Sequence, residues 1–148
     1  MIILAIDPGS VSGALCLHGD HPLQPIVDDL PVVDRQVDAA GLAMLIDQLR
    51  PDVAVVERVG AMPKQGVTST FRFGVAVGII HGCIASHGIP MHLVTPNVWK
   101  RHFSLGPDKE AARALAIRLY PSVEGLARKK DAGRAEALLI AHWFATKG

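Results

Sequence analysis

Apolar residues occur along the chain in short blocks whose spacing changes between strand and helix patterns. The first block, MIILAID, is a continuous apolar run that ends in an acid, and it predicts a buried strand. The sequence PGSVSG predicts a turn, and ALCLHG predicts a second strand that forms a hairpin with the first. A third strand is expected around residues 25–30, at the edge of a sheet because prolines accompany it.

The rest of the chain predicts helices that alternate with short strands. Residues 37–49 have leucine and isoleucine at helical spacing, and residues 52–56 are a short β-branched run closed by an acid, Glu57. Thr95 is expected to cap a helix that has Pro96 in its first position. The other expected elements are a loop over 58–67, a strand over 91–94, a basic loop over 127–130, and helices over 68–87, 96–103, 108–120 and about 132–146.

This order of elements predicts the fold class. Three strands in a meander imply an antiparallel part of a sheet, and the strand–helix–strand units that follow imply a parallel part. We therefore expect an α/β protein with a mixed sheet and helices on both of its faces. A chain of 148 residues is long enough for one core, so residues 1–148 are expected to form a single domain.

Composition is that expected of a folded protein inside a cell. The chain is 49% hydrophobic and 20% charged, which excludes a disordered segment. No uninterrupted apolar run approaches the ~20 residues of a membrane span, and the N-terminus resembles neither a signal nor a transit peptide. Cys16 and Cys83 lie in apolar segments, as free thiols do in a reducing compartment. We expect a cytoplasmic protein of a bacterium or a phage-infected host, with no membrane association, in preference to an organellar protein.

Charge is unevenly distributed although the formal net charge is only +1. Residues 1–57 contain two basic and nine acidic residues, whereas residues 58–148 contain thirteen basic and five acidic ones, a local excess of +8. Such an asymmetry is typical of a surface that binds a polyanion. The alternative is a solvated charged face.

Two acids, Asp7 and Glu57, end predicted strands. Ligands of open parallel sheets collect at the carboxyl ends of the strands, and neighbouring strands lie about 4.8 Å apart. Carboxylates that close repel each other unless a cation or a proton lies between them, and Mg²⁺ and Mn²⁺ prefer such oxygen ligands. The alternative for an acid that follows a strand is a role in a turn or a helix cap.

A third acid, Glu136, is predicted on the buried face of the last helix. Leu139, Ile140 and Trp143 follow it by three, four and seven residues and share its stripe. An ionised acid on that face needs a partner. Three acids that each lie against an apolar element predict a metal site. Asp131 is a poor match for the same helix face and would approach from the preceding loop.

Four segments spread over most of the chain resemble one family. They are IDPGSVSG, VVERVGAMPKQGVTSTFRFG, VTPNVWK and KKDAGRAEALLIA. IDPG alone is weakly specific, but the four in this order resemble RuvC-like Holliday junction resolvases of the ribonuclease H-like superfamily. The similarity is greatest to the branch found in bacteriophages and plant organelles. It implies a mixed five-stranded sheet, three antiparallel strands followed by two parallel ones, with helices on both faces.

The resemblance also implies an activity and its cofactor. Proteins of this family are homodimers that bind a four-way DNA junction and make paired, symmetric nicks with Mg²⁺, for which Mn²⁺ is expected to substitute. The products would carry 5′-phosphate ends. Two cations per active site, about 3.5–4 Å apart, activate a water and stabilise the leaving oxygen in such nucleases.

Positions in the family motifs assign the metal ligands. Asp7, Glu57 and Glu136 correspond to three of four metal-binding acids. Many relatives have an acid or a histidine three residues before the last acid, where this chain has Gly133. Asp131 is the nearest candidate for the fourth ligand.

Other residues are candidates for DNA contact. The family counterpart of Lys109 lies near the scissile phosphate, which makes Lys109 a candidate catalytic residue; the alternative is an exposed lysine at a helix start. Relatives insert an apolar side chain near the junction crossover from the loop after Glu57, and here Met62 is the candidate wedge or, alternatively, packs within the loop. Further candidates from this loop and the basic half are Lys64, Gln65, Arg72, Lys100, Arg128, Lys129, Lys130 and Arg134.

Gly74, Gly78 and Gly82 recur at a spacing of four in the helix expected over 68–87. Each glycine inside a helix costs about 1 kcal/mol relative to alanine, so a compensating contact is expected. In the family this helix lies at the dimer interface, which suggests that the glycines line a homodimer contact. The alternative is packing against the sheet or helices of the same domain.

Three alternative functions stay open at this point. A nucleotide-binding ATPase or sugar kinase also begins with an acid–glycine turn, but it needs two such lobes, which 148 residues do not supply. Gly133 favours a junction-binding protein with impaired catalysis. A related nuclease that acts on flaps, forks or RNA–DNA hybrids has the same sequence features.

Overall fold

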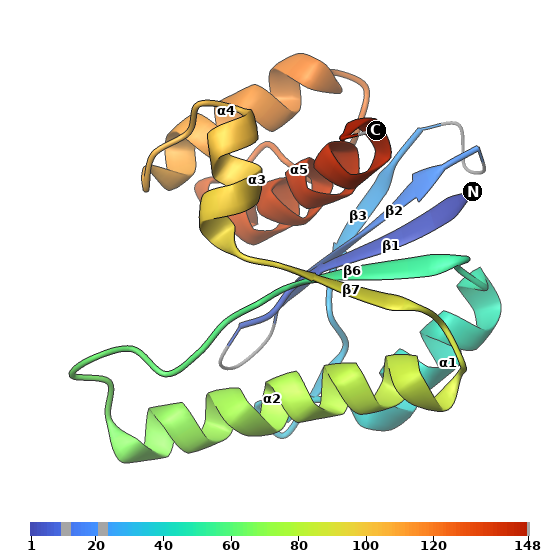
Figure 1. Cartoon of the computed structure of the whole chain (residues 1–148), viewed down its shortest axis with the longest axis vertical. Coiled ribbons are helices and arrows are strands. Elements are labelled where there is room, and N and C mark those ends of the chain that lie inside the picture. Colours follow the sequence, from blue (N-terminus) through green and yellow to red (C-terminus); the bar gives the residue numbers. More distant parts are fainter. Residues whose placement is uncertain (10–12, 21–23, 148) are drawn as a thin grey trace.

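The computed structural model describes residues 1–9, 13–20 and 24–147 (Figure 1). The main strands are β1 (Ile2–Asp7), β2 (Ala14–Gly19), β3 (Ile26–Asp29), β6 (Val53–Glu57) and β7 (Met91–Val94). They form one five-stranded sheet in the order β3-β2-β1-β6-β7. The pairs β1–β2 and β2–β3 are antiparallel, whereas β1–β6 and β6–β7 are parallel. The predicted mixed sheet is therefore confirmed.

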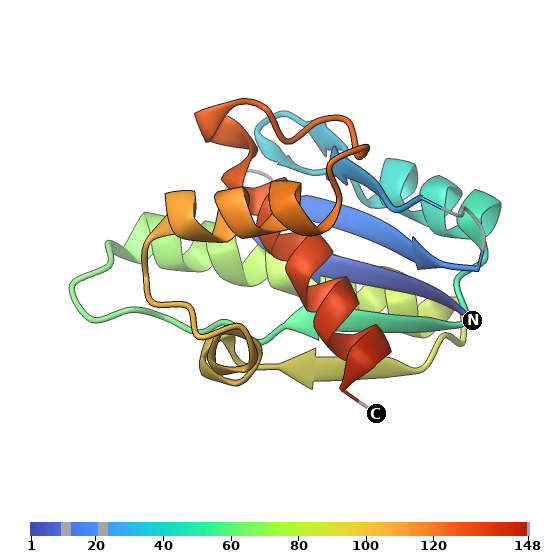
Figure 2. The same ribbon diagram turned by 90° about the horizontal axis from the view of Figure 1, so that it is seen from above.

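Helices cover both faces of this sheet, as expected. The helices α1 (Ala39–Leu49) and α2 (Val67–Ser86) lie on one face, and α3 (Pro96–His102), α4 (Lys109–Leu119) and α5 (Ala132–Thr146) lie on the other (Figures 1 and 2). Figure 2 shows α5 crossing above the middle strands. The last helix thus packs across β2, β1 and β6.

Side-chain alternation along the strands decides which face receives the acids. Ile3 and Ala5 of β1, and Val55 of β6, are buried in the core that α5 covers. Because successive side chains of a strand point to opposite faces, Asp7 and Glu57 follow them onto the α5 side.

The boundaries of the predicted helices agree with the structure to within two residues. Thr95 has the extended backbone of an N-cap residue before Pro96, although its side chain makes no capping hydrogen bond. A two-stranded hairpin of β4 (Val32–Val33) and β5 (Gln36–Val37) was not predicted, because two-residue strands are too short to show a period. The predicted basic loop contains a 3₁₀ turn, η1 (Lys129–Asp131). The predicted turn in PGSVSG includes residues 10–12, which lie outside the described residues.

One helix meets the length and composition of a membrane-crossing segment, contrary to the expectation of none. Over an 18-residue window of α2 the mean hydropathy is 1.4, and 17% of that window is buried. Glycine, serine and threonine interrupt the apolar runs without lowering the average much, which is why a search for continuous runs missed it. A single helix of this kind is a weak indication of a membrane span.

Candidate active site

The first two acids lie side by side at the carboxyl ends of neighbouring strands. β1 and β6 pair in parallel with Ile6 opposite Val56, so Asp7 and Glu57 are the next residues along each strand. Glu57 is buried, with 8% of its surface exposed. The predicted neighbourhood of these two strands is therefore confirmed.

The third acid, Glu136, comes to the same cavity from helix α5, which covers this face of the sheet. Glu136 lies in the second turn of α5 and is only 4% exposed. All three acids line one open cavity of about 380 Å³. Pro8, Gly9, Gly13, Ala14, Asp29, Lys109, Lys130, Gly133 and Arg134 complete its wall.

Electrostatic strain marks this cluster. Burial, and then the charges of Glu57 and Glu136, hold the pKa of Asp7 well above its usual range. Burial also raises the pKa of Glu57, against a hydrogen bond from Trp99 that lowers it. Lys109 opposes the shift in both acids. The protein by itself therefore does not neutralise the negative charge that it gathers here.

Lys109 is the basic residue in closest recorded contact with the acids. Its Nζ lies 3.2 Å from Oε1 of Glu136. Partial burial lowers the pKa of Lys109, but the charge and hydrogen bond of Glu136 outweigh this and raise it. Within the described residues, no three acid, histidine or cysteine side chains are already gathered as a metal cage. The donor set still fits a hard cation, because three carboxylates around one cavity supply only oxygen ligands.

Sequence reasoning missed Trp99, which is fully buried beside the site. Its Nε1 donates a hydrogen bond of 2.7 Å to Oε2 of Glu57. The motif VTPNVWK contained the residue, but only the fold shows that α3 begins where β7 runs beside β6. A tryptophan in a predicted core always raises the question of which acceptor its N–H finds, and that question could have singled it out.

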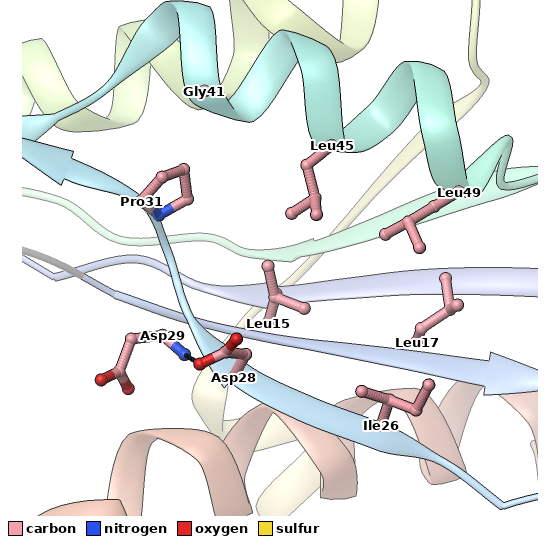
Figure 3. Close-up of a pocket in the computed structure, with 9 residues that line it drawn as sticks. All are labelled: Leu15, Leu17, Ile26, Asp28, Asp29, Pro31, Gly41, Leu45 and Leu49. Atoms are coloured by element: carbon pink, nitrogen blue, oxygen red, sulfur yellow. Dashed lines mark hydrogen bonds between the residues drawn. The ribbon is translucent and has the colours of Figure 1, made fainter.

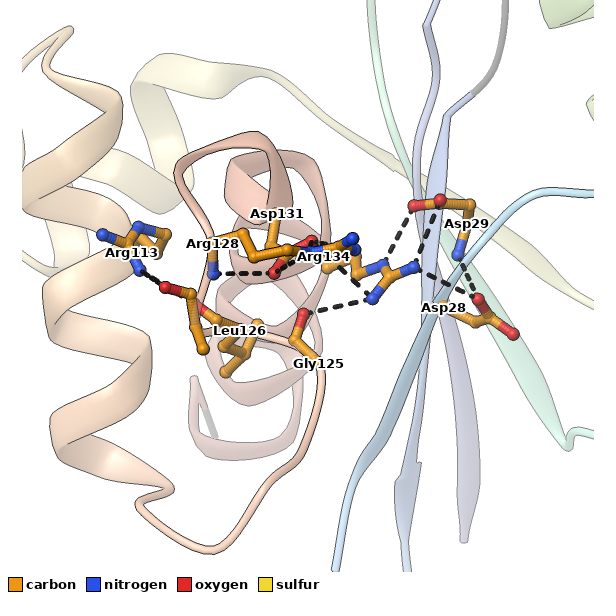
Figure 4. A network of polar contacts seen from close by, with 9 residues as sticks. Asp28, Asp29, Arg113, Gly125, Leu126, Arg128, Asp131 and Arg134 are labelled. Atoms are coloured by element: carbon orange, nitrogen blue, oxygen red, sulfur yellow. Dashed lines mark hydrogen bonds and ion pairs between the residues drawn. The ribbon is translucent and has the colours of Figure 1, made fainter.

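The structure does not bring Asp131 to the three acids. Its carboxylate accepts hydrogen bonds from Arg128, with Oδ1 2.8 Å from Nη2 and Oδ2 2.9 Å from the backbone nitrogen (Figure 4). Arg134 lies 3.7 Å from the same carboxylate. The hydrogen bond and charge of Arg128 hold the pKa of Asp131 below its usual range. As placed, this acid belongs to an ion-pair network and does not line the cavity.

Gly133 occupies the position that faces Asp7. A Cβ built on Gly133 would lie 3.7 Å from Oδ2 of Asp7 and 3.6 Å from Cβ of Ala14, which is ordinary van der Waals contact. A side chain at residue 133 would therefore point into the cavity. Gly133 supplies none, so the position that faces Asp7 is open. Besides Asp7, Glu57 and Glu136, the acid that lines the cavity is Asp29, whose carboxylate is paired with Arg134.

Five of the predicted DNA-binding residues lie at or near the cavity, and two of these five are engaged in ion pairs. Lys130 and Arg134 line the cavity, and Lys100 lies close enough to Glu57 to lower its pKa. Arg134 is mostly buried and pairs with Asp29, Nε to Oδ1, at 3.0 Å (Figure 4). Arg128 is likewise engaged with Asp131, while Lys129 is exposed on η1.

The remaining candidates lie in the loop after β6 and at the start of α2, which extend away from the sheet in Figure 1. The backbone of Met62 accepts from the backbone N–H of Gln65, and its own N–H donates to Oε1 of Gln65, both at 3.1 Å. Met62 is 69% exposed. Lys64 is exposed, and Arg72 is partly exposed on the first turns of α2. Phe71, whose exposure was not foreseen, is 73% exposed on the same part of α2.

The glycine stripe of α2 faces open space. Nothing lies within 4 Å of a Cβ built on Gly74, Gly78 or Gly82. These glycines therefore do not serve close packing against the described part of their own domain, which was the alternative to a dimer contact.

A second cavity, of about 290 Å³, lies on the α1 side of the sheet and is mainly apolar (Figure 3). Leu15, Leu17 and Ile26 from the sheet face Leu45 and Leu49 of α1 across it. It contains no basic residue among those that line it, and only Asp29 borders both cavities. Its chemistry does not match the acidic site.

Curated proteins that are similar to the chain share one name. No family model matches the chain. Crossover junction endodeoxyribonuclease RuvC of Corynebacterium diphtheriae is 30% identical over 99 residues, which cover 66% of this chain and 59% of that protein. The protein of the same name from Chloroflexus aggregans is 28% identical over 97% of this chain and 93% of its own length. The chain thus spans about three fifths of the first relative and most of the second.

A solved structure shares the fold over the whole chain. Thermus thermophilus RuvC in complex with a Holliday junction substrate superposes with a TM-score of 0.72 at 18% identity, covering 100% of this chain and 97% of that one. The assignment to the phage and plant-organelle branch stays a prediction. The chain is therefore similar in sequence to the proteins named RuvC, and it shares the fold of the Thermus thermophilus RuvC structure.

Proposed function

We propose that this protein is a Holliday junction resolvase, a metal-dependent DNA endonuclease that makes paired, symmetric nicks in four-way junctions and leaves 5′-phosphate ends. The convergence of Asp7, Glu57 and Glu136 on one open cavity carries the proposal. The relatives named crossover junction endodeoxyribonuclease, and the structure of one RuvC with a Holliday junction, support it. We further propose that residues 1–148 act as one nuclease domain in the cytoplasm of a bacterium or a phage-infected host.

The proposed cofactor is Mg²⁺, with Mn²⁺ as a substitute and two ions per active site. Asp7, Glu57 and Glu136 would hold them, because their carboxylates line the cavity and the raised pKa of Asp7 marks negative charge without enough positive charge. Such cations, when bound, activate a water and stabilise the leaving oxygen. We do not assign Asp131 to this set, because Arg128 already engages both of its carboxylate oxygens.

Lys109 is the proposed catalytic cation of the chain itself. Lys109 lines the acidic cavity, and its ammonium pairs with the Glu136 carboxylate. A lysine carries a compact charge that suits one phosphate oxygen. Lys109 would therefore place the scissile phosphate above the three acids and balance its charge.

The DNA would lie along the basic residues around the cavity. Besides Lys109, Lys130 lines the cavity and Lys100 lies close enough to Glu57 to lower its pKa, and Lys129 extends the surface along η1. Lys64, Gln65 and Arg72 would contact the DNA arms from the loop and the start of α2. Arg128 and Arg134 are proposed as support for this surface, since intramolecular carboxylates engage both guanidinium groups.

Met62 is the proposed wedge at the junction crossover. It is exposed on a turn that Gln65 braces by two hydrogen bonds to its backbone. An apolar side chain presented in this way can insert between base steps, and Phe71 offers a second exposed apolar side chain nearby in sequence. Replacing Met62 by serine should weaken junction binding while leaving binding to a linear duplex unchanged in a gel-shift titration.

We propose that the protein is a homodimer that pairs through α2 along Gly74, Gly78 and Gly82. A symmetric dimer would place two cavities on one junction, as paired nicks require. The open space above the glycines supports this contact.

The variant Gly78→Glu tests the dimer. Because nothing lies near that position, the substitution should leave the monomer folded and shift sedimentation from dimer to monomer at micromolar concentration. Ala40→Glu, on the exposed side of α1, is the control and should sediment like wild type. A wild-type protein that sediments as a monomer would contradict the proposal.

Gly133 supports one alternative, a protein that binds junctions but cleaves them weakly. A missing fourth acid reduces the charge available to hold metal, so affinity for Mg²⁺ would be low. Nicking that increases steeply with metal concentration would fit an active resolvase with a weak site, whereas binding without nicking at high Mg²⁺ or Mn²⁺ would favour the alternative.

Cleavage of an end-labelled four-way junction with Mg²⁺ tests the proposal. We expect symmetric nicks that DNA ligase can reseal, because the ends carry 5′-phosphates. Asp7→Asn should bind the junction and leave it intact. A linear duplex and a 5′ flap serve as controls, and equal cleavage of the flap would favour the alternative nuclease that acts on other branched DNA.

A further inference from the structure

Trp99 and Glu57 satisfy each other inside the protein. The indole Nε1 donates to Oε2 of Glu57 at 2.7 Å, and Trp99 has no exposed surface. A buried indole N–H without an acceptor is costly, and so is a buried carboxylate without donors. The pair is therefore stable only while both members are present.

The position of Trp99 is set by the pairing of β6 with β7 and by the start of α3. β7 pairs with β6 so that Val94 lies opposite Glu57, and the backbone N–H of Arg58 donates to the carbonyl of Val94 at 2.7 Å. Two residues later Pro96 begins α3, in which Trp99 is the buried residue. The ring therefore sits in the core at a position that the parallel strand pair sets.

The hydrogen bond from Trp99 restricts rotation of the Glu57 side chain, which the strand backbone alone does not restrict. A strand fixes the backbone of Glu57, but its carboxylate can still rotate about three side-chain bonds. With Oε2 directed at the indole, Oε1 is the oxygen for which no donor is recorded among the described residues. Oxygen ligands that are pre-oriented by outer hydrogen bonds bind metal more tightly than mobile ones.

We propose that Trp99 is a positioning residue of the metal site, which holds the Glu57 carboxylate in the orientation that binds the cation. The proposal rests on the metal role of Glu57 in the proposed function. It assigns to α3 a duty beyond packing, because the indole N–H acts on a group that itself would touch the metal.

Calorimetric titration with Mn²⁺ distinguishes positioning from packing. Trp99→Phe keeps an aromatic ring in the core and removes the N–H donor. Loss of an outer-shell hydrogen bond of this kind typically weakens metal binding by about 10–100-fold, and we expect at least tenfold here. Trp143→Phe is the matched control, since Trp143 is partly buried in the same core and does not line the cavity. It should keep the wild-type dissociation constant.

Junction cleavage supplies a second readout. For Trp99→Phe, the Mg²⁺ concentration at half-maximal nicking should rise about tenfold, and saturating Mg²⁺ should restore most of the wild-type rate. A merely structural role would lower the rate at every metal concentration. Equal Mn²⁺ affinities of wild type and folded Trp99→Phe would overturn the role of Trp99 alone. Absence of metal binding in wild type would overturn the proposed function as well.

The chain also offers a test without altering the pair. It has two tryptophans, so in Trp143→Phe the emission comes from Trp99 alone. Titration with Mg²⁺ should change that emission with the midpoint that a calorimetric Mg²⁺ titration of the same variant gives, because Glu57 accepts the indole hydrogen bond. An emission that stays constant while calorimetry shows Mg²⁺ binding would contradict the proposal even if Trp99→Phe fails to fold.

Discussion

Two acidic regions lie near the start of α5, one around Asp131 and one around Asp7, and the pKa values of these two carboxyl groups are shifted in opposite directions. Asp131 is 2% exposed, yet its pKa is lowered because Arg128 donates to it and Arg134 lies close by. Asp7 has its pKa raised by burial and by two other acids. The comparison teaches that burial alone does not identify a functional acid. Arginine side chains pair with Asp131, whereas Asp7 has two other acids and, within the described part of the chain, only Lys109 as a counter-charge. At Asp7 a bound cation would supply the missing positive charge.

Helix geometry accounts for this division. At about 100° per residue, a position three before Glu136 lies on nearly the same helix face, whereas one five before it points away. Gly133 is therefore the residue that faces Asp7, and Asp131 turns toward the arginines. The chain thus has its acid in the supporting network and its glycine at the cavity.

The largest expected effect concerns the hub of the paired region. Arg134 bridges α5 to Asp29 at the end of β3 and to Asp131 in η1. Removing one partner of a buried ion pair costs about 3–5 kcal/mol, and because Asp29 is largely exposed we expect about 2 kcal/mol from Arg134→Ala. Urea unfolding measures it. Arg118 is an exposed residue of α4, so Arg118→Ala should change the free energy of unfolding by less than about 0.5 kcal/mol. Equal losses for the two variants would contradict the stabilising role of Arg134.

A smaller effect is expected when the open position is filled. Gly133→Asp adds a carboxylate next to Asp7 without a steric clash. Affinity for Mn²⁺ should rise about tenfold, or about 1.4 kcal/mol, while the metal-free protein becomes less stable through added repulsion. Gly133→Asn has the same size without the charge and serves as the control. If both variants bind metal equally, residue 133 does not face the site.

The smallest expected effect is on how stability depends on pH, because Asp7 and Asp131 contribute to it with opposite signs. The folded state holds the Asp7 proton more tightly than the unfolded state does, so this stabilisation is complete below the ordinary pKa of 3.8 and is lost as pH rises through the raised folded value. At pH 7 without metal, Asp7→Asn should therefore be more stable than wild type. Mg²⁺ should stabilise only the wild type.

Asp131 should behave in the opposite way. Its pKa is lowered in the folded state, so its stabilisation is present above 3.8 and is lost as pH falls through the lowered value. Asp131→Asn should therefore be less stable than wild type at pH 7 and should approach it in acid. Thermal melts of both variants across pH measure the two signs, and parallel curves would contradict the comparison.

Much of the fold was predictable because long elements carry their period in the sequence. The five strands, the mixed sheet and the five helices follow from apolar runs, proline positions and helical spacing. The β4–β5 hairpin was not, since two-residue strands have no measurable period. The neighbourhood of Asp7 and Glu57 was predictable once both were recognised as strand ends.

What the sequence did not show at the site comes mainly from contacts between elements. The pairing of Asp131 with Arg128 is an exception, because these residues are three apart in one capping box. Nothing in the local sequence says that Arg134 reaches β3 across 105 residues. The contact of Trp99 with Glu57 joins residues 42 apart and depends on how α3 leaves the sheet. Such pairs are set by tertiary packing, which a one-dimensional pattern does not contain.

Nicking of a four-way junction by the Asp7→Asn and Asp131→Asn variants, side by side with wild type in Mg²⁺, tests the central claim most directly. Each substitution removes one negative charge at nearly constant size. We predict that Asp7→Asn binds the junction but does not nick it. Asp131→Asn, assayed well below its melting temperature, should nick at close to the wild-type rate. Nicking by Asp7→Asn at the wild-type rate, or loss of nicking in folded Asp131→Asn, would contradict the account.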